Sequence, residues 1–207
     1  MIVKQYGLVY SRVTEADIEL IRYWRNKPFI RQTMQYQEYI TADMQKEWFK
    51  KINNKYNYYF LIEYEGKKIG LINCKDTDMN RVAEGGIFLW ETSYWNTPVP
   101  ALASLTMLEA IFEEFQSGHT SIVTVLKNNT KAIKFNQYLG YRIYEEHTYV
   151  YKLKLTLEDY YTKTYKLKKA AQILTGKENS HLQIIAEPSE LLDDLINAYL
   201  IKKQKTL

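Results

Sequence analysis

The chain has 207 residues, which is enough for one domain with a substantial hydrophobic core and an additional segment. Its 46% hydrophobic and 25% charged residues are typical of soluble globular proteins, and a net charge of +4 does not indicate a nucleic-acid partner, although it suits a phosphate-bearing ligand. The single cysteine, Cys74, excludes an internal disulfide, and no group of cysteines and histidines has the spacing of a metal site.

The N-terminal segment Met1–Tyr6 lacks the apolar run of a signal peptide, and no stretch is as long as a transmembrane helix. We therefore expect a cytoplasmic protein with no membrane partner. Leu8–Val13 predicts a first strand. Thr14 then caps a helix, with Asp17 in the place of the capping-box glutamate, and this helix ends where Pro28 prevents its continuation.

Two further elements are predicted before the centre of the chain. Two hydrophobic segments, residues 58–64 and 68–74, flank Glu65-Gly66-Lys67 and predict a β-hairpin. Thr41 is the predicted cap of a helix whose apolar face comprises Met44, Trp48, Phe49 and Ile52.

The central stretch predicts a strand, a loop and a helix. Residues 83–90 have the composition of a buried strand, and the loop 94–100 leads into the helix. Thr97 is the predicted N-cap and Pro98 the first helical residue, where a missing N–H group carries no penalty. Gly118 ends this helix. Its predicted apolar face holds Ala101, Leu102, Leu105, Leu108, Phe112 and Phe115, with Glu109, Glu113 and Glu114 outside it.

A second strand and helix follow. Residues 121–126 predict the strand, and Asn129 caps a helix that closes at residues 139–141. Residues 141–146 and 149–155 predict a closing antiparallel pair. Free N–H groups and the dipole of a helix N-terminus attract anions, so a strand that leads into a helix is a candidate anion site.

The two helices of this stretch carry recognisable residue patterns. Asn129, Ala132 and Phe135 are followed by Leu139-Gly140-Tyr141, and the earlier helix follows the loop Tyr94-Trp95-Asn96-Thr97-Pro98-Val99-Pro100. These patterns resemble two motifs of the GNAT acetyltransferases, Asn-x-x-Ala-x-x-Phe with Leu-Gly-Phe and Tyr-Trp-Gly-x-Gly-x-Ala. The predicted order β-α-α-β-β-β-α-β-α-β-β is similar to that of the family as well.

The resemblance implies an α/β GNAT fold over residues 1–155. In that fold a central mixed, mostly antiparallel sheet is splayed at its middle and flanked by helices. The resemblance also implies an N-acetyltransferase that uses acetyl-CoA. Residues 156–207 lie outside the resemblance and form a predicted helical C-terminal extension.

In the family, the opening between two central strands exposes backbone groups that bind the pantetheine arm of the cofactor. Here these strands are 86–90 and 122–126, and Gly85-Gly86 marks either such an opening or a simple bulge. Lys127 and Lys131 could meet the phosphates or remain solvated. The predicted cofactor-binding residues are Phe88, Leu89, Trp90, Asn96, Thr97, Val99, Ala101, Asn129, Lys131 and Phe135.

The phosphate loop departs from the family pattern. A pyrophosphate cradle uses consecutive backbone N–H groups, and the family has small residues where this chain has Asn96, Pro98 and Pro100. Each proline removes one donor and stiffens the turn. Acetyl-CoA binding is predicted, but the prolines could weaken it, rearrange it or abolish it, with the amides of residues 96, 97, 99 and 101 as the remaining donors.

Glu84 is the candidate general base. It precedes the two glycines in an otherwise apolar strand, where partial desolvation would raise its pKa toward neutrality. The alternative is a strand-end glutamate that faces solvent.

A general acid is harder to assign. The tyrosine that often follows the helix phenylalanine in the family is Asn136 here, and Tyr138 falls on the far side of the helix, where we expect it to be packed. His119 and His147 are isolated and predicted to lie on the surface.

The acceptor region is also similar to part of the family. Trp24-Arg25-Asn26-Lys27-Pro28, with Ile30-Arg31 and Met34, resembles the branch that acetylates a 4-amino sugar carried on a nucleotide. The implied substrate-binding residues are Arg25, Asn26, Arg31, Met34 and Tyr36.

Three functions remain open at this point. The first is acetylation of a small-molecule amine, foremost a nucleotide-linked amino sugar, which predicts a closed pocket with basic and aromatic walls. The second is acetylation of a protein N-terminus, which predicts an open groove near residues 25–36. The third is a catalytically impaired GNAT-fold binding protein, because of the prolines.

The C-terminal extension has regular apolar stripes, so we expect it to be ordered. Tyr160, Thr164, Leu167, Ala171 and Leu174 recur at heptad-like spacing. A second helix is predicted to open at Pro188, with Leu192, Leu195, Ile196 and Tyr199 on one face, and to bury its Leu195–Tyr199 face. These helices could pack on the domain or form a homodimer or partner surface.

Overall fold

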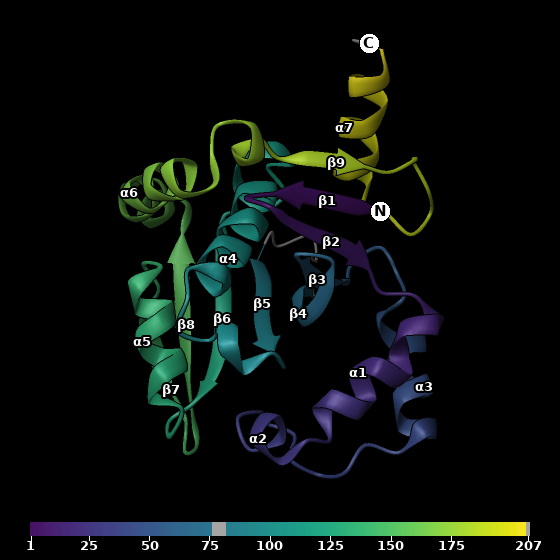
Figure 1. The fold of residues 1–207 in the computed structure, drawn as a ribbon, viewed down its shortest axis with the longest axis vertical. Helices are drawn as coiled ribbons and strands as arrows, with labels where there is room; N and C mark the ends of the chain where they lie inside the picture. Colours follow the sequence, from purple (N-terminus) through teal and green to yellow (C-terminus); the bar gives the residue numbers. More distant parts are fainter. Residues whose placement is uncertain (76–81, 206–207) are drawn as a thin grey trace.

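The computed structural model of this chain describes residues 1–75 and 82–205. These residues contain one nine-stranded sheet in the order β7-β8-β6-β5-β4-β3-β2-β1-β9, of which only the β5–β6 pair is parallel (Figure 1). The predicted mixed, mostly antiparallel α/β architecture is therefore confirmed. The strands are β1 (Ile2–Gln5), β2 (Leu8–Arg12), β3 (Tyr58–Tyr64), β4 (Lys67–Lys75), β5 (Val82–Leu89), β6 (Thr120–Leu126), β7 (Arg142–Glu146), β8 (Val150–Thr156) and β9 (Gln183–Ile185).

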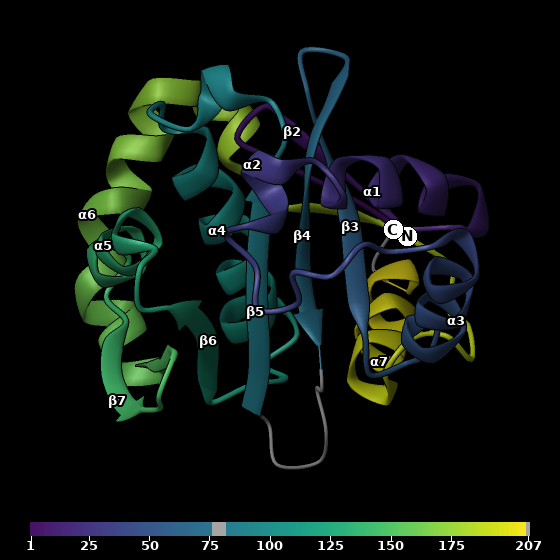
Figure 2. The same ribbon diagram turned by 90° about the horizontal axis from the view of Figure 1, so that it is seen from below.

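Helices cover both faces of the sheet. One face packs on α1 (Ile18–Arg25), α2 (Pro28–Arg31) and α3 (Ala42–Ile52), in a core that includes Trp24 and Trp90. The other face packs on α4 (Val99–Glu109), α5 (Thr130–Tyr138), α6 (Leu157–Thr175) and α7 (Asp194–Gln204). Figure 2 shows α5 and α6 at one edge of the sheet and α1 and α3 at the other. None of the helices in residues 1–75 and 82–205 is both long and apolar enough to cross a membrane.

Local sequence signals account for most helix starts and turns. Thr14 and Asp17 form the predicted capping box, and the Thr41 side chain accepts a hydrogen bond from the Met44 N–H group. The hairpin turn between β3 and β4 places Glu65 and Gly66 at positive φ angles of 51° and 75°. These interactions join residues close in the chain, so the sequence predicts them directly.

The strands β1 and β9 were not predicted. β1 is joined to β2 by a tight turn at Tyr6 and Gly7, and β9 pairs antiparallel with β1, from Ile2 opposite Ile185 to Lys4 opposite Gln183. Each strand has three or four residues, too few for a periodic pattern to be read. The C-terminal extension thus contributes an edge strand to the sheet of the preceding domain.

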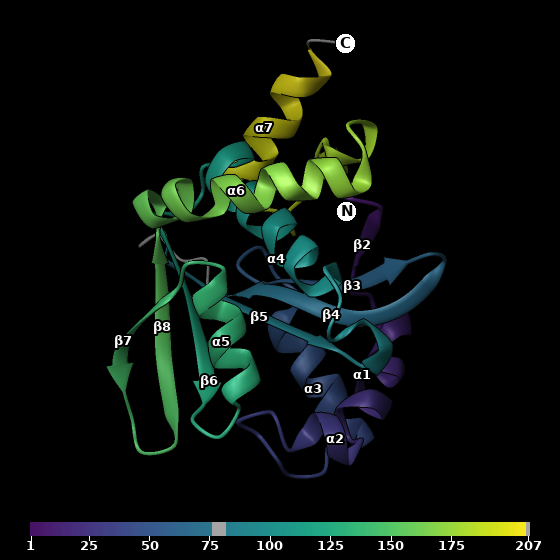
Figure 3. The same ribbon diagram turned by 60° about the vertical axis from the view of Figure 1, so that its left-hand side comes forward.

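The sheet opens between β5 and β6. These strands pair only where Val82–Glu84 lies beside Thr120–Ile122, and Figure 3 shows them diverging beyond that end. β5 keeps an uninterrupted register with β4 from Glu84 to Leu89, so the alternative of a bulge at Gly85-Gly86 is wrong and the predicted splay is confirmed.

Helix α4 differs from its prediction at both ends. It starts at Val99, after Pro98 in the cap position, and the Thr97 hydroxyl accepts a hydrogen bond from the Val99 N–H group at 3.3 Å. Its last turn continues as a π-helix over Ala110–Glu114. Glu109, predicted on the polar face, is buried with 8% exposure because β1 and α6 cover that face, so this assignment is wrong.

The C-terminal helices pack on the rest of the chain mostly through the predicted faces, with Leu174 and Leu195 as exceptions. Tyr160, Thr164 and Ala171 of α6 are buried as expected, whereas Leu174 is 60% exposed. The last helix begins after Asp193 rather than at Pro188. Leu192, just before this helix, and Ile196 and Leu200 within it are buried. Of the predicted face, Leu192 and Ile196 therefore lie inward and Tyr199 packs against Phe115, whereas Leu195 is 41% exposed and its assignment is wrong.

Candidate functional site

A cavity of about 980 Å³ lies at the opening between β5 and β6. Side chains alternate along a strand, so Glu84, Gly86 and Phe88 of β5 face helices α1–α3, whereas Ala83 and Ile87 face α4. The cavity therefore has an α1 side, lined by residues of α1–α3, and an α4 side, lined by residues of α4 and α5. It connects the two faces of the sheet at the point where the strands separate.

Six of the ten predicted cofactor-binding residues line this cavity. Trp90 instead stacks on Trp24 in the α1–α3 core, with ring centroids 5.8 Å apart, and its indole N–H group donates to the Lys68 carbonyl. Val99 is buried in the main core, and Thr97 and Ala101 lie beside the cavity wall without lining it. The six lining residues are Phe88, Leu89, Asn96, Asn129, Lys131 and Phe135.

Two backbone N–H groups of the loop before α4 are already hydrogen-bonded within the loop. The Thr97 N–H group donates to the Tyr94 carbonyl at 3.2 Å, and the Val99 N–H group donates to the Thr97 hydroxyl. Among the described residues, the amides of Asn96 and Ala101 have no hydrogen-bond partner. Two of the four predicted phosphate donors are therefore committed within the loop.

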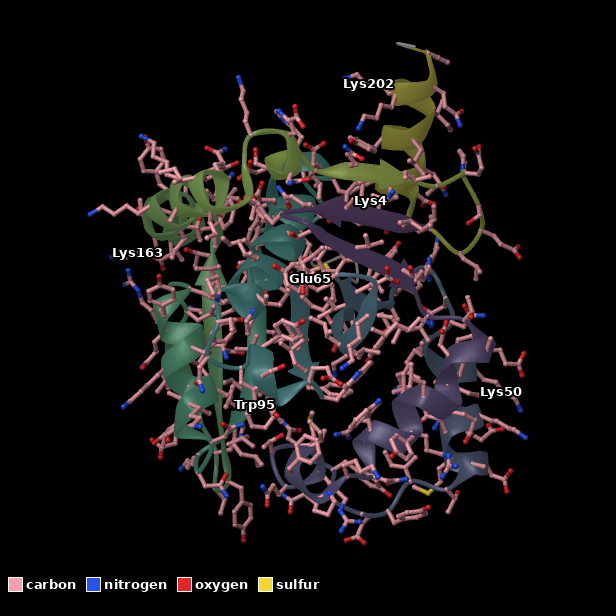
Figure 4. The ribbon with its side chains drawn as sticks, viewed as in Figure 1. Lys4, Lys50, Glu65, Trp95, Lys163 and Lys202 are labelled. Atoms are coloured by element: carbon pink, nitrogen blue, oxygen red, sulfur yellow. The ribbon has the colours of Figure 1, made fainter. Side chains whose placement is uncertain are left out.

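Trp95, labelled in Figure 4, anchors this loop at the end of β5. Its indole N–H group donates to the Leu89 carbonyl at 2.8 Å, and its ring lies 6.0 Å from that of Phe29 in α2. Across the cavity, the Asn129 side chain caps α5 by accepting from the Ala132 N–H group at 3.2 Å, as predicted. Lys134, one turn after Lys131 on the same helix, also lines the cavity and was missed.

Glu84 is the last residue of β5 that pairs with β6, and its carboxylate lines the cavity. One carboxylate oxygen lies 2.8 Å from the Lys75 ammonium group, and the other accepts from the Thr124 hydroxyl at 3.3 Å. With 26% side-chain exposure, Glu84 is partly shielded rather than turned to solvent. Its immediate neighbours are polar, in contrast to the apolar setting expected from the strand sequence.

A glycine is required at position 86 because the Asn73 side chain packs closely against it. A Cβ atom at Gly86 would lie 2.8 Å from the side-chain oxygen of Asn73, which also lines the cavity. Asn73 in turn donates to the Glu84 carbonyl at 3.4 Å. A larger residue at this position would displace Asn73 next to Glu84.

Of the residues considered as general acids, Asn136 lines the cavity and Tyr138 does not. Tyr138 is 65% exposed, so its predicted packing is wrong, because α5 turns that face to solvent. The Asn136 side chain lines the cavity and donates to the Ala132 carbonyl. His147 lies on the surface as expected, in contact with Glu145.

One buried hydroxyl pair on the cavity wall was not anticipated. The Tyr141 and Ser121 hydroxyl groups lie 2.8 Å apart. Burial raises the pKa of Tyr141 well above its ordinary value, which makes it a poor proton donor. The described residues contain no cluster of His, Cys, Asp and Glu side chains that could hold a metal ion.

Three of the five predicted substrate-binding residues, Arg25, Met34 and Tyr36, line the α1 side of the cavity. Asn26 does not, because its amide side chain makes two hydrogen bonds of 2.8 Å to the Ile40 backbone and holds that segment in place. Arg31 lies on α2 outside the cavity wall.

The sequence reasoning missed other residues on the α1 side. Trp48 and Tyr59 line it with their rings in edge contact, 5.2 Å apart. Gln45 also lines it and is only 3% exposed, whereas its neighbour Met44, predicted on the apolar face of α3, is 40% exposed. Helix α3 is rotated so that Gln45, rather than Met44, faces the sheet. The apolar pattern of the helix does not show this rotation, which depends on how α3 packs against the sheet.

A family model for the acetyltransferase (GNAT) domain matches residues 8–142. No curated protein sequence matches the chain.

Solved structures are similar in fold. The nucleotide-linked sugar GNAT FdhC, in its apo form, has 20% identity and a TM-score of 0.68, with 85% of this chain and 99% of that chain covered. PseH, an N-acetyltransferase of Campylobacter jejuni, has 22% identity and a TM-score of 0.54, with 74% and 96% covered. The spermidine N-acetyltransferase of Vibrio cholerae, in complex with CoA and spermine, has 18% identity and a TM-score of 0.61, with 75% and 98% covered.

Proposed function

The chain belongs to the GNAT acetyltransferase family, and on this premise we propose that it transfers an acetyl group from acetyl-CoA to the primary amine of a nucleotide-linked amino sugar. The observation that carries the proposal is the cavity, which crosses the sheet through the opening between β5 and β6. A donor and an acceptor can approach each other from opposite faces of such a sheet, and Glu84 lies where they would meet. Holding two reactants in this way accounts for much of the acceleration of an acyl transfer.

The α4 side fits acetyl-CoA. Beyond Glu84, β5 has no strand partner on its β6 side among residues 1–75 and 82–205, so its backbone polar groups there are available to the amides of a pantetheine arm. The amides of Asn96 and Ala101 and the ammonium groups of Lys131 and Lys134 could hold its phosphates. When bound, acetyl-CoA supplies an activated acetyl thioester.

We assign Glu84 as the proton acceptor for the incoming ammonium group. The Lys75 ammonium group pairs with the Glu84 carboxylate. The ammonium group of the acceptor carries the same charge as Lys75, so it could replace Lys75 beside Glu84 and leave the net charge there unchanged. Tyr141 is a poor acid and Asn136 cannot donate a proton at neutral pH, so neither residue would protonate the leaving thiolate.

The walls of the α1 side support an amino-sugar nucleotide as acceptor. They combine basic groups, Arg25 and Lys75, with the aromatic rings of Trp48, Tyr59 and Phe88, beneath α1–α3. Basic and aromatic walls are expected for a sugar nucleotide, and they support this class of acceptor over a protein N-terminus. The similar structure FdhC is described as a nucleotide-linked sugar GNAT, which favours the same class.

Binding and transfer should be measured in sequence. Calorimetry is expected to show that acetyl-CoA and CoA bind, and CoA should raise the melting temperature because it binds the folded state. Incubation of acetyl-CoA with a panel of 4-amino-sugar nucleotides, polyamines and peptides should then release free thiol with the sugar nucleotides. Absence of CoA binding at millimolar concentration would overturn the proposal, and CoA binding without transfer to any amine would identify a GNAT-fold binding protein.

A further inference from the structure

We propose that the α1 side of the cavity recognises a phosphate group of the acceptor through Arg25 and Gln45. The inference rests on the proposed function, which it deepens by naming the group that the pocket selects. It predicts an acceptor that carries its amine and its phosphate at opposite ends of one small molecule.

Two buried hydrogen-bond donors face this part of the cavity without a partner in the described part of the chain. One is a terminal nitrogen of the Arg25 guanidinium group, and the other is the amide nitrogen of Gln45. Native structures rarely leave buried donors unsatisfied, and exceptions of this kind occur where a ligand binds. These two nitrogens can donate hydrogen bonds but cannot accept them, so the missing partner offers acceptor atoms.

The charge of the lining residues indicates that this partner is anionic. Arg25 stays charged in a protein, and its guanidinium group has no ion pair among the described residues. Glu84 is the only aspartate or glutamate among the described residues that line the cavity, and it is paired with Lys75. A polycationic acceptor would therefore meet uncompensated positive charge here, whereas a phosphate would neutralise a buried cation.

The position of Arg25 gives the approximate span of the acceptor. Its guanidinium carbon lies over the ring of Phe88, 5.8 Å from the ring centroid, which fixes the planar group beside the cavity. Phe88 and Glu84 are four residues apart on one face of β5, so their Cα atoms are separated by about 13 Å. A carboxylate on the carbon next to the amine cannot bridge this separation, whereas a phosphate on the far side of a hexose ring can.

Calorimetry with uridine diphosphate tests this assignment. The titration is made with saturating CoA present, so that the diphosphate cannot occupy the cofactor's phosphate site. The wild-type protein should bind uridine diphosphate at least about tenfold more tightly than uridine, because charged hydrogen bonds to the phosphate are lost with uridine. Arg25→Gln should reduce this affinity about 10- to 100-fold, and Arg25→Lys should retain part of it.

Lys50→Gln is the matched control, since Lys50 lies on α3 near Gln45 in the chain but points away from the sheet (Figure 4). It removes the same charge and should leave the affinity unchanged. Gln45→Met should weaken uridine diphosphate binding without weakening CoA binding. Melting temperatures of all variants are compared to confirm that each one folds.

The outcomes separate the two proposals. Failure of CoA to bind would contradict the proposed function. If CoA binds and an amino-sugar nucleotide is acetylated, but Arg25→Gln leaves the uridine diphosphate affinity and the acceptor KM unchanged, only the phosphate assignment is overturned. No binding of uridine diphosphate by the wild-type protein, or equal binding of uridine, would overturn it as well.

Discussion

Replacement of both loop prolines by glycine, Pro98→Gly with Pro100→Gly, is expected to tighten CoA binding. The first N–H groups of a helix have no partner within the helix and point toward an incoming anion. In the wild-type loop only the amides of Asn96 and Ala101 are free, because those of Thr97 and Val99 are hydrogen-bonded. The double variant would add two donors at the same helix end.

The size of the effect follows from two opposing contributions. A hydrogen bond to a charged group is worth about 1.5–3 kcal/mol, so even one new bond to a phosphate would be significant. Loss of each proline increases the freedom of the unbound loop and costs about 0.4–1 kcal/mol. If both new amides reach phosphate, the gain exceeds the loss by about 1–5 kcal/mol, which corresponds to binding that is roughly fivefold to several-thousandfold tighter.

The dissociation constant of CoA should be measured by calorimetry for the wild type, both single variants and the double variant. Pro188→Gly is a suitable control, because it changes a proline in the segment before α7, away from the cavity wall. Urea unfolding would establish that the double variant is folded. If it is folded and binds CoA more weakly than the wild type, the prolines belong to a rearranged phosphate site and the reasoning is refuted.

Four other predictions concern catalysis, stability and assembly. Glu84→Gln should keep CoA affinity and lower turnover by about two to four orders of magnitude, and unchanged turnover at every pH would exclude Glu84 as the base. Burial raises the pKa of Glu109 above its ordinary value of 4.5, despite hydrogen bonds from Tyr6 and Gln5. The stability that Glu109 contributes is therefore present below pH 4.5 and is lost as the pH rises through the raised pKa. Glu109→Gln should therefore flatten the pH dependence of the free energy of unfolding above pH 4.5, and parallel wild-type and variant profiles in urea titrations would contradict this. Amide hydrogens in the middle of α6 and α7 should exchange slowly, and fast exchange throughout residues 156–205 would show that the extension does not pack as observed. A homodimer through the C-terminal helices would use α6, where Ile173 is 86% and Leu174 60% exposed. Sedimentation should show a dimer that the double variant I173E/L174E dissociates. A wild-type monomer at high concentration would refute this prediction.

The sequence by itself determined the elements whose causes are local. The capping box at Thr14 and Asp17, the Asn129 cap and the turn at Glu65 and Gly66 join residues no more than four positions apart. Their formation depends on backbone chemistry that is visible in a short window. The order of strands and helices, the splay at Gly85-Gly86 and the placement of Glu84 followed from these local signals together with the family resemblance.

Only the tertiary structure decided which residues pack against each face of the helices and of the sheet. Glu109 is buried because β1 and α6 converge on it, with Gln5 and Lys168 as partners far away in the chain. β9 forms only because the edge of β1 is available to it. Arg25 and Gln45 both line the cavity because α1 and α3 pack on one face of the sheet, although the two residues are 20 positions apart in the chain. Burial and the proximity of distant side chains depend on how the elements pack together, and the periodicity of a single helix or strand cannot specify them.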